Sequence, residues 1–322
     1  MNSGWRPAAS IQTLRRRAAL LEATRAFFRE RGVLEVETPV VLSHTVTDVQ
    51  IESLRLDADS GARWLQTSPE YPMKRLLAAG SGDIFQVCHV FRAGEHSRVH
   101  NPEFTLVEWY RLGMDLQQLM DETAALAARL FEAGGHPAGP VEHVSYAGAF
   151  AQVLGCDPHT ATQPQLAALA ARHGLVESSL ATATRDELLE FLVATQVGPT
   201  LGRGRLTCLH HFPASQAALA QLDAADPRTA LRFELYAEGV ELANGYVELA
   251  SGSEQRQRFL ADQAERRRRG LAEPTLDERL IAALESGLPS CAGVALGFDR
   301  TAMLALGAGS IAEVMAFSWE QA

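Results

Sequence analysis

Long apolar runs are missing from this sequence of 322 residues. A helix that crosses a bilayer needs about 20 consecutive, mostly apolar residues, and no stretch of that kind occurs. The N-terminal arginines, Arg15 to Arg17, lead into an amphipathic segment rather than an apolar one, so the sequence predicts no secretory signal. We therefore expect a cytoplasmic protein that does not enter the membrane.

Cysteine is scarce as well. The four cysteines are scattered, without a CxxC pair and without a spacing typical of metal ligands: Cys88, Cys156, Cys208 and Cys291. Disulfide-stapled secreted domains and zinc sites use dense or regularly spaced cysteines, so both classes are disfavoured. We expect reduced, mostly buried thiols in one large domain or two small ones.

Positive charge is the third scarcity, because the formal net charge is −10. A protein that holds nucleic acid broadly by its phosphates usually has a basic surface. Lys74 is the only lysine, and every other basic side chain of fixed charge is an arginine. The one basic run, Arg266 to Arg269, lies in an expected helix and is interpreted as its solvated face. The composition therefore disfavours broad nucleic-acid binding.

The hydrophobic pattern predicts a mixture of helices and strands. Segments 83–92 and 103–111 alternate like strands and are separated by a polar turn, so they predict an antiparallel hairpin. Segment 231–249 predicts a second hairpin, turned near Glu238 and Gly239. Asp115 is expected to cap a helix. Further helices are expected at 13–31, 164–173, 185–194, 253–269 and from Asp277, with strands at 33–40 and in GVALGFDR.

Charged residues interrupt the faces of both hairpins. In EFTLVEWYR (103–111), Phe104, Leu106 and Glu108 share one face of the expected strand. An unpaired buried charge costs several kcal/mol, so such a face is either open to water or part of a charged cleft. The mixed signs favour a cleft for a ligand with both an amine and phosphates. The residues concerned are Glu70, Arg92, Asn101, Glu103, Glu108, Glu241, Glu248 and Arg300.

Five segments of the chain resemble the catalytic domain of class II aminoacyl-tRNA synthetases, specifically the lysyl type. RGVLEVETPV resembles motif 1, which ends in a proline, here Pro39. FRAGEHSRVHNPEFTLVEWY resembles motif 2, and GVALGFDRTAMLAL resembles motif 3. TSPEYPMKRL and ELANGYVEL resemble the stretches that hold the amino acid and the metal in lysyl enzymes. Each match alone is weak, but together they follow the family's order from residue 13 to residue 317.

The resemblance implies an α+β fold, the class II synthetase catalytic core, in which helices flank an antiparallel sheet. We expect one catalytic domain over residues 1–322, with a helical insertion at about 140–200. About a dozen residues precede the motif 1 segment, so we expect no anticodon-binding domain and no anticodon-dependent tRNA binding. In this the chain is most similar to the stand-alone lysyl-synthetase paralogues that modify elongation factor P.

What those paralogues do becomes the functional expectation. They use ATP to activate (R)-β-lysine as an aminoacyl-adenylate, and they transfer it to the ε-amine of a lysine on elongation factor P. The resemblance also implies a homodimer formed through the motif 1 region, with ATP as co-substrate and Mg²⁺ as the metal.

At the phosphate end of the site, the resemblance implies that Arg92 and Arg300 are the catalytic residues. Arg92 would bridge the substrate carboxylate and the α-phosphate, where a bidentate guanidinium stabilises developing negative charge. Arg300 would contact the γ-phosphate from a helix start. Glu241 and Glu248 would hold Mg²⁺, which prefers oxygen ligands.

At the amino-acid end, a diamine needs at least two acceptors, because an ammonium left without a partner resists desolvation. The resemblance implies that Glu70 holds one amine and that Tyr110 meets the other. The full set expected to bind the substrate is Ser68, Pro69, Glu70, Tyr110, Glu248, Glu254 and Ala295. Ala295 stands where lysyl synthetases have glycine, and its extra methyl is expected to disfavour α-lysine relative to β-lysine.

The remaining nucleotide contacts are implied for Asn101, the Leu242 backbone, His100 and Gly297, where a Cβ would meet the nucleotide. One position departs from the family's pattern: the acid two residues after the motif 2 arginine is replaced by Gly94, and Glu95 follows. Gly94 and Glu95 are kept as ATP-binding candidates. Glu103 and Glu108 are expected to brace the motif 2 arginines.

Three alternatives stay open at this point. The chain could charge tRNA as a truncated lysyl-tRNA synthetase. It could be a non-catalytic paralogue that senses amino acids, although Arg92, Glu241, Glu248 and Arg300 argue against this. It could form amides like ammonia-dependent asparagine synthetase, but that family would need cations where Glu70 and Glu248 lie.

Overall fold

The centre of the protein is an eight-stranded sheet, seen in a computed structural model that describes residues 5–59 and 61–322. The strand order is β1-β5-β6-β11-β10-β9-β8-β7. The six inner strands are antiparallel to their neighbours, and only the two outermost pairs are parallel. The strands are β1 Leu34–Glu35, β5 Ile84–Phe91, β6 Glu103–Leu112, β7 Val141–Ser145, β8 Leu206–Pro213, β9 Thr229–Ala237, β10 Val240–Val247 and β11 Cys291–Gly297.

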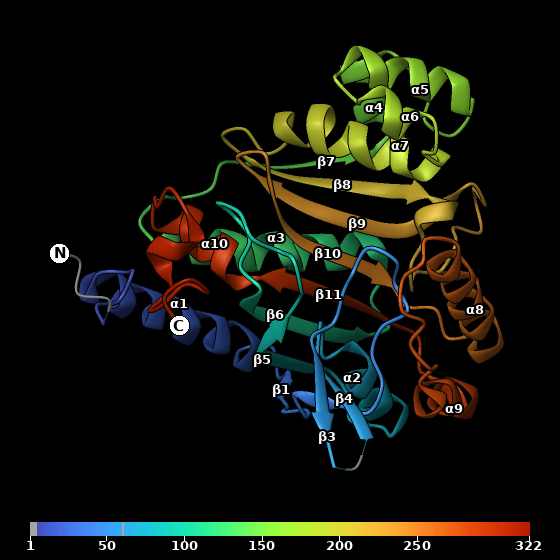
Figure 1. Cartoon of the computed structure of the whole chain (residues 1–322). Coiled ribbons are helices and arrows are strands. Elements are labelled where there is room, and N and C mark those ends of the chain that lie inside the picture. The colour runs from blue at the N-terminus through green and yellow to red at the C-terminus, as the bar shows by residue number, and fades with distance from the viewer. Residues whose placement is uncertain (1–4, 60) are drawn as a thin grey trace.

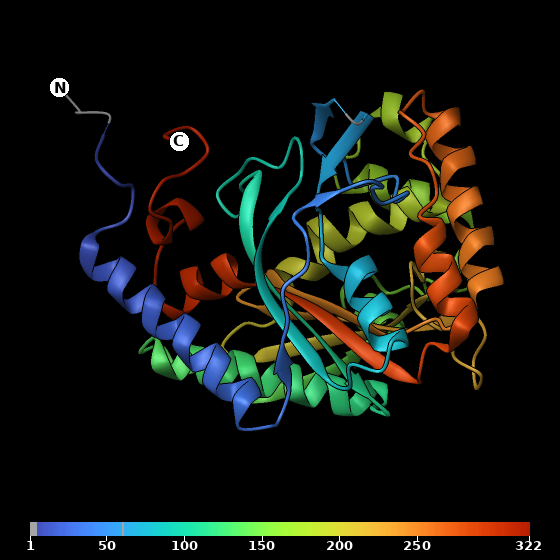
Figure 2. The ribbon, with the colours of Figure 1, turned by 90° about the horizontal axis from the view of Figure 1, so that it is seen from below.

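Three helices cover one face of this sheet: α1 (Ile11–Arg29), α3 (Leu116–Ala133) and α10 (Phe298–Ala305). Asp115 begins α3 with a capping box, because its side chain accepts from Gln118 N while the Gln118 side chain accepts from Asp115 N. Figure 2 shows α1 and α3 side by side as one layer beneath the strands. This layer closes the sheet on one side only.

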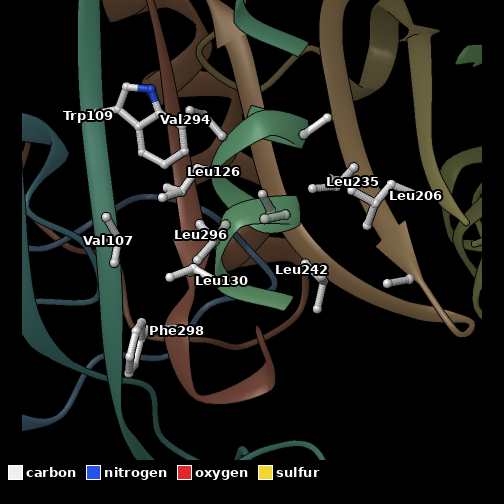
Figure 3. Packing of buried hydrophobic residues seen from close by; sticks show 14 of the residues in the cluster. Val107, Trp109, Leu126, Leu130, Leu206, Leu235, Leu242, Val294, Leu296 and Phe298 are labelled. Carbon is white, nitrogen blue, oxygen red and sulfur yellow. The ribbon is translucent and has the colours of Figure 1, made fainter. Parts of the chain in front are cut away.

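The main core lies between that layer and the sheet. Figure 3 shows Val107 and Trp109 of β6 near Val294 of β11, with Leu126 and Leu130 of α3 packed against them. Side chains alternate across a strand, so the residues between these point to the opposite face. The core therefore fixes Glu108 and Ala295, which pair across β6 and β11, on the face that α1 and α3 leave free.

Smaller elements border the free face. A three-stranded sheet is formed by β2 (Val41–Leu42), β4 (Gly61–Leu65) and β3 (Arg55–Ala58). Helices α2 (Glu70–Ala78), α8 (Gly252–Arg268) and α9 (Glu278–Gly287) pack together around Tyr71 and Phe259 at one end. Figure 1 shows α2, α8 and α9 gathered on the same side of the molecule.

The segment between β7 and β8 forms a helical unit with its own hydrophobic cluster, built around Tyr146, Phe150 and Leu189. It contains α4 (Tyr146–Leu154), α5 (Gln163–Arg172), α6 (Glu177–Leu180), α7 (Arg185–Leu192) and the short turns η1 (Val193–Val197) and η2 (Gly198–Thr200). Two further turns, η3 (Ala214–Gln216) and η4 (Ile311–Val314), lie elsewhere. The unit packs on β8 at the top of Figure 1, where the helical insertion was expected.

The predicted α+β architecture is confirmed, and so are both hairpins. The second hairpin turns at Glu238 and Gly239, which have φ of 50° and 74°, as a tight turn between antiparallel strands requires. The strand expected at 33–40 is much shorter, because only Leu34 and Glu35 pair with β5.

Two expectations about side chains had different outcomes. The four thiols are free, with Cys208 and Cys291 buried and the other two half-buried, as expected. The prediction that the basic run is a solvated face is wrong at Arg266, which is buried and donates to Ala272 O and Asp48 O.

No helix among the described residues combines the length and the apolar character that a membrane crossing requires.

Candidate active site

A cavity of about 730 Å³ lies on the free face of the sheet. Its floor is formed by β6, β9, β10 and β11, whose side chains point away from the core. α2 and α8 border one end, and the 92–101 segment with the start of α10 borders the other. We call these the carboxyl end and the arginine end, after the charged groups that each contains.

A single ammonium joins two carboxyls at the carboxyl end. Lys74 Nζ lies 2.6 Å from Glu70 Oε1, one helical turn earlier on α2, and 2.6 Å from Glu248 Oε2, just after β10. Lys74 and Glu248 are almost fully buried. Lys74 engages Glu248 Oε2 in this ion pair, whereas Glu248 Oε1 lacks a hydrogen-bond donor among the described residues. Oε1 remains able to accept from a ligand.

A third carboxyl, that of Glu108, faces the same space. Ser68 Oγ donates to Glu108 Oε2 at 2.7 Å, and Tyr110 OH donates to Glu108 Oε1 at 2.7 Å. Ser68 Oγ also accepts from Glu70 N at 3.0 Å, which fixes the first turn of α2 beside β6. The expectation that Glu108 braces a motif 2 arginine is therefore wrong, because the strand alternation turns it towards Ser68. Glu103 likewise contacts His89 rather than an arginine.

One ammonium cannot neutralise three carboxyls, of which Glu108 and Glu248 are buried and Glu70 is part-buried, and the surplus negative charge alters their protonation. Burial, followed by the charge of Glu70, raises the pKa of Glu108 to about 7. Burial raises the pKa of Glu248 to about 8 against the pull of Lys74. Burial lowers the pKa of Lys74, but the charges of Glu248 and Glu70 raise it by more than burial lowers it. The net shift is upward, so Lys74 stays charged. A ligand with two ammonium groups would supply the charge that this end lacks.

Gly293 of β11 leaves the space that these groups need. A Cβ at Gly293 would lie 2.4 Å from both Glu248 Oε1 and Tyr110 Cε1, and both side chains are buried. No such contact is tolerated, so only glycine fits under Glu248 and Tyr110. Ala295, two residues along the same strand, lines the cavity and pairs with Glu108 and Asn244.

Two guanidinium groups mark the arginine end. Arg92 Nε donates to Thr67 O at 3.3 Å, its Nη1 lies 3.7 Å from Glu95 Oε1, and the guanidinium lies 5.1 Å above the Phe104 ring. Arg300 donates from Nε to Val99 O at 3.1 Å and from Nη1 to Glu241 O at 3.0 Å. Both side chains remain part exposed, at 25% and 22%, so each has N–H groups free for an anion.

The predicted metal pair does not come together. Glu241 and Glu248 lie seven residues apart along the extended β10 and its continuation. At about 3.3 Å per residue, their Cα atoms are roughly 20 Å apart, whereas Mg²⁺ binds oxygen at about 2 Å. Glu248 is also engaged by Lys74. One ion cannot be held by both carboxylates.

Glu234 of β9 is the acid that faces Glu241. Tyr236, two residues from Glu234, pairs with Glu241, and both acids line a smaller adjoining cavity of about 370 Å³. Burial, followed by the charge of Glu241, raises the pKa of Glu234 to about 7. Arg232 Nη2 lies 2.7 Å from Glu234 Oε1 and offsets part of this repulsion. Among the described residues, no cluster of three or more His, Cys, Asp or Glu could hold a metal alone.

The nucleotide candidates lie mostly at the arginine end. His100, Asn101, Glu95 and Gly297 line the cavity. Burial, followed by the charge of Arg300, lowers the pKa of His100, which favours a neutral ring. Asn101 is held on both sides, since Nδ2 donates to Glu103 O and Oδ1 accepts from Trp319 N.

Gly297 is free of protein constraints, because a Cβ there would meet only Leu242 O at 3.7 Å and Arg300 Cδ at 3.8 Å. Its φ of −69° is open to any residue. A bound ligand, and not the protein, would therefore be the reason for glycine at this position. Leu242 lines the cavity while its side chain belongs to the core. Gly94 has φ of +77° in the turn after Arg92.

Three candidates lie outside the cavity lining: Gly94, Pro69 and Glu254. Pro69 is the N-cap of α2, between Ser68 and Glu70, which do line it. Glu254 is half-exposed on α8, and its Oε1 lies 2.5 Å from Arg258 Nη2. Its neighbour Gln255 faces the cavity instead.

Sequence reasoning missed several residues of the site: Lys74, Gly293, Glu234, Arg232 and Gln255. The available signal for Lys74 was its spacing of four from Glu70 and its status as the only lysine of the chain. A compact ammonium fits between two carboxylates where a guanidinium would need more room.

Comparisons with known proteins agree with this geometry. The family model described as tRNA synthetases class II (D, K and N) matches residues 4–321. A protein from Vibrio cholerae named elongation factor P–(R)-β-lysine ligase is 48% identical over 327 residues, covering 100% of this chain and 99% of the relative. Proteins of the same name from Pasteurella multocida (46% identical; 99% of this chain, 98% of the relative) and Mannheimia succiniciproducens (48%; 97% of each) are similarly close. The chain therefore belongs to the class II tRNA synthetase family, among the elongation factor P–(R)-β-lysine ligases.

Proposed function

We propose that this protein uses ATP to activate (R)-β-lysine as an aminoacyl-adenylate and transfers the β-lysyl group to the ε-amine of a lysine on elongation factor P. The names of its relatives give the substrate and the acceptor. The observation that supports the chemistry is the polarity of the cavity. One end contains three carboxyls, two of them buried, against one ammonium, and the other contains two part-exposed arginines.

This polarity suits a diamine that ends in a carboxylate and meets a nucleotide. The two ammonium groups of β-lysine would lie against Glu70, Glu108 and Glu248, where they compensate the surplus negative charge. Ser68 and Tyr110 would keep the Glu108 carboxylate in place through their two hydrogen bonds. The carboxylate of the substrate would then point along the floor towards Arg92.

In the first step, a carboxylate oxygen of β-lysine attacks the α-phosphorus of ATP. The new O–P bond forms as the bond to the bridging oxygen breaks, so pyrophosphate leaves. Arg92 would bridge the carboxylate and the α-phosphate, and Arg300 would hold the terminal phosphate. No side-chain nucleophile is needed, because positioning and charge neutralisation supply the catalysis.

Glu241, which lines the main cavity beside Arg300, is the residue that would hold Mg²⁺. Mg²⁺ is commonly bound through one or two carboxylates plus substrate phosphates. When bound, Mg²⁺ would neutralise charge on the phosphates. Glu234 is occupied by protein donors instead, since Arg232 Nη2 donates to its Oε1 at 2.7 Å and Tyr236 OH donates to its Oε2 at 2.6 Å.

In the second step, the neutral ε-amine of the acceptor lysine attacks the carbonyl carbon of the adenylate. The C–N bond forms, the C–O bond to the phosphate breaks, and AMP leaves as the amine loses its proton. The enzyme's own lysine cannot compete as acceptor, because Lys74 is buried and ion-paired.

The alternatives fit less well. A tRNA acceptor would approach a protein of net charge −10. A non-catalytic sensor would not need Arg92, Arg300 and Glu241 around one cavity. An enzyme that activates an acidic side chain would need cations where Glu70, Glu108 and Glu248 lie.

We also propose a homodimer formed through the 34–41 segment. Leu34 and Val41 are 54% and 46% exposed on β1 and β2, which are edge strands of the large and the small sheet, and a partner would cover them. A cytoplasmic location agrees with the four free thiols.

ATP–pyrophosphate exchange tests the activation step. We expect exchange that depends on (R)-β-lysine, weaker exchange with α-lysine, and none with an analogue that lacks the distal amine. Arg92→Ala should abolish exchange while the protein stays folded. The matched control is Arg75→Ala, an exposed arginine on α2 without a role in the cavity. Full exchange by folded Arg92→Ala would refute the assignment.

A further inference from the structure

The large cavity extends beyond the residues assigned above. Its lining continues from the carboxyl end to segments 46–51, 184–190, 214–219 and 258–269. These segments belong to the loop after β2, to α7 of the helical insertion, to the turn after β8 and to α8. We call them the collar. Figure 2 shows α8 and the insertion on the same side of the sheet, opposite α1 and α3.

Side-chain contacts join the collar segments into a ring, although the segments are far apart in the sequence. Each contact links a different pair of segments. Thr47 Oγ1 donates to Asp262 Oδ2 at 2.7 Å, Gln50 Nε2 donates to Glu190 Oε2 at 3.0 Å, Arg269 Nη2 lies 3.0 Å from Glu187 Oε1, and Ser215 Oγ donates to Asp186 Oδ1 at 2.7 Å. The helical insertion therefore takes part in shaping this opening.

The cavity-facing side of the collar is acidic, because its lining contains six carboxylates and two arginines, Arg258 and Arg269. Four of its carboxylates have no cation within 4.0 Å among the described residues: Asp48, Asp186, Glu190 and Asp262. Arg232 near Glu190, and Arg258 and Arg266 near Asp262, offset part of the negative charge without forming a direct ion pair with these carboxylates. Partial burial, followed by the charges of Asp186 and Asp48, raises the pKa of Glu190. The carboxylates repel one another, and a cationic partner would relieve that repulsion.

The inner wall of the collar contains buried oxygens that accept no hydrogen bond from the described residues. Gln255 lies seven residues before Asp262 on α8, about 10 Å further in along the helix. Gln255 is 1% exposed, lines the cavity, and its Oε1 has no hydrogen-bond donor among the described residues. Glu248 Oε1 is in the same condition. A buried oxygen without a donor is costly, so this passage is suited to a ligand with N–H groups.

We propose that the collar is the docking surface for the acceptor protein, and that the acceptor lysine enters the cavity through it with flanking cationic residues against Asp48, Asp186, Glu190 and Asp262. This inference rests on the proposed function, since it needs a protein lysine as acceptor. The acidic collar attracts a basic segment of a protein and repels the phosphates of an RNA.

The test separates the two half-reactions. Asp186→Asn with Glu190→Gln removes two charges of the insertion and keeps the acceptors for Ser215 and Gln50. Asp48→Asn with Asp262→Asn does the same on the other side of the ring. Glu177→Gln, an exposed acid of the insertion outside the cavity lining, is the matched control. For each protein we would measure β-lysine-dependent pyrophosphate exchange, and the KM for elongation factor P at two salt concentrations.

Each double variant should raise the KM for elongation factor P by about five-fold or more at low salt, with a smaller change at high salt. Its exchange activity and its melting temperature should match those of Glu177→Gln. Unchanged acceptor KM in both double variants would overturn the docking proposal. So would a rise in the KM for β-lysine alone, because the collar would then admit the small substrate and not the protein. If wild-type enzyme exchanges pyrophosphate but does not modify elongation factor P, the proposed function fails first.

Discussion

Lys74 Nζ and Glu248 Oε2 lie 2.6 Å apart inside the protein, one on α2 and the other just after β10. Both side chains are 1% exposed. This ion pair, with Glu70 as its second acid, fixes the position of α2 against the sheet and sets the charge of the carboxyl end.

Lys74→Met should therefore destabilise the protein strongly. It leaves Glu70 and Glu248 without their cation in a buried site, and breaking a buried pair in this way typically costs about 3–5 kcal/mol. Urea unfolding followed by circular dichroism measures this, with exposed Arg75→Met as the control. A loss no larger than that of Arg75→Met would show that the pair does not hold the carboxyl end together.

The free enzyme should lose stability as the pH rises from 5 to 8.5. Glu108 and Glu248 have folded-state pKa values of about 7 and about 8, above the 4.5 of an unperturbed glutamate. Their protonated forms are favoured by folding, so this stabilisation is complete below about pH 4.5 and is lost as the pH passes 7 to 8. For Glu108 alone the loss is on the order of 3 kcal/mol. Melting temperatures across the pH range, in buffers of matched ionic strength, would show it.

Saturating β-lysine should reverse that trend, because two ammonium groups stabilise the ionised carboxyls. The rise in melting temperature on adding β-lysine should be larger at pH 8 than at pH 6. Glu108→Gln should flatten both curves. If wild-type enzyme and Glu108→Gln had the same pH dependence, the surplus charge would have to be assigned to other groups.

Gly293→Ala and Gly297→Ala form a matched pair on β11. The first places a Cβ 2.4 Å from Glu248 Oε1 and the Tyr110 ring, so we expect at least a ten-fold rise in the KM for β-lysine with little change for ATP. The second has only ordinary contacts with the protein and should raise the KM for ATP instead. Pyrophosphate exchange gives both constants. The same effect on both substrates from both variants would contradict the assignment of the two ends.

Ala295→Gly should reduce the enzyme's preference for β-lysine over α-lysine. Ala295 lies on the cavity floor opposite Glu108, and one methyl against a fitted ligand is typically worth about 1–3 kcal/mol. We expect kcat/KM for α-lysine to rise about ten-fold relative to that for β-lysine. An unchanged isomer ratio in pyrophosphate exchange would move the selectivity to Glu70, Ser68 and Tyr110.

Local patterns in the sequence were sufficient for much of the fold. The hairpin of β5 and β6 follows from its alternation and polar turn, and α3 begins at Asp115 because the capping box is a local feature. The length predicted for the strand at 33–40 was wrong because this segment lies at the edge of the sheet. Its pairing with β5 covers two residues, and hydrophobicity alone does not set that length.

The charge arrangement of the site could not be predicted in the same way. Glu108 hydrogen-bonds to Ser68, 40 residues away, and Lys74 reaches Glu248 only because α2 packs beside the end of β10. Glu234 faces Glu241 through the register and bulge of β9 and β10. These contacts depend on tertiary packing, whereas Arg92 and Arg300 were recognisable from the motifs that contain them.

The most direct test of the central claim is the intact mass of elongation factor P after incubation with enzyme, ATP and (R)-β-lysine, with peptide mapping of the modified residue. We predict the addition of one β-lysyl group to one lysine of elongation factor P, and none with Arg92→Ala. An unmodified elongation factor P, in a reaction where the same enzyme preparation charges tRNA with lysine, would contradict the account.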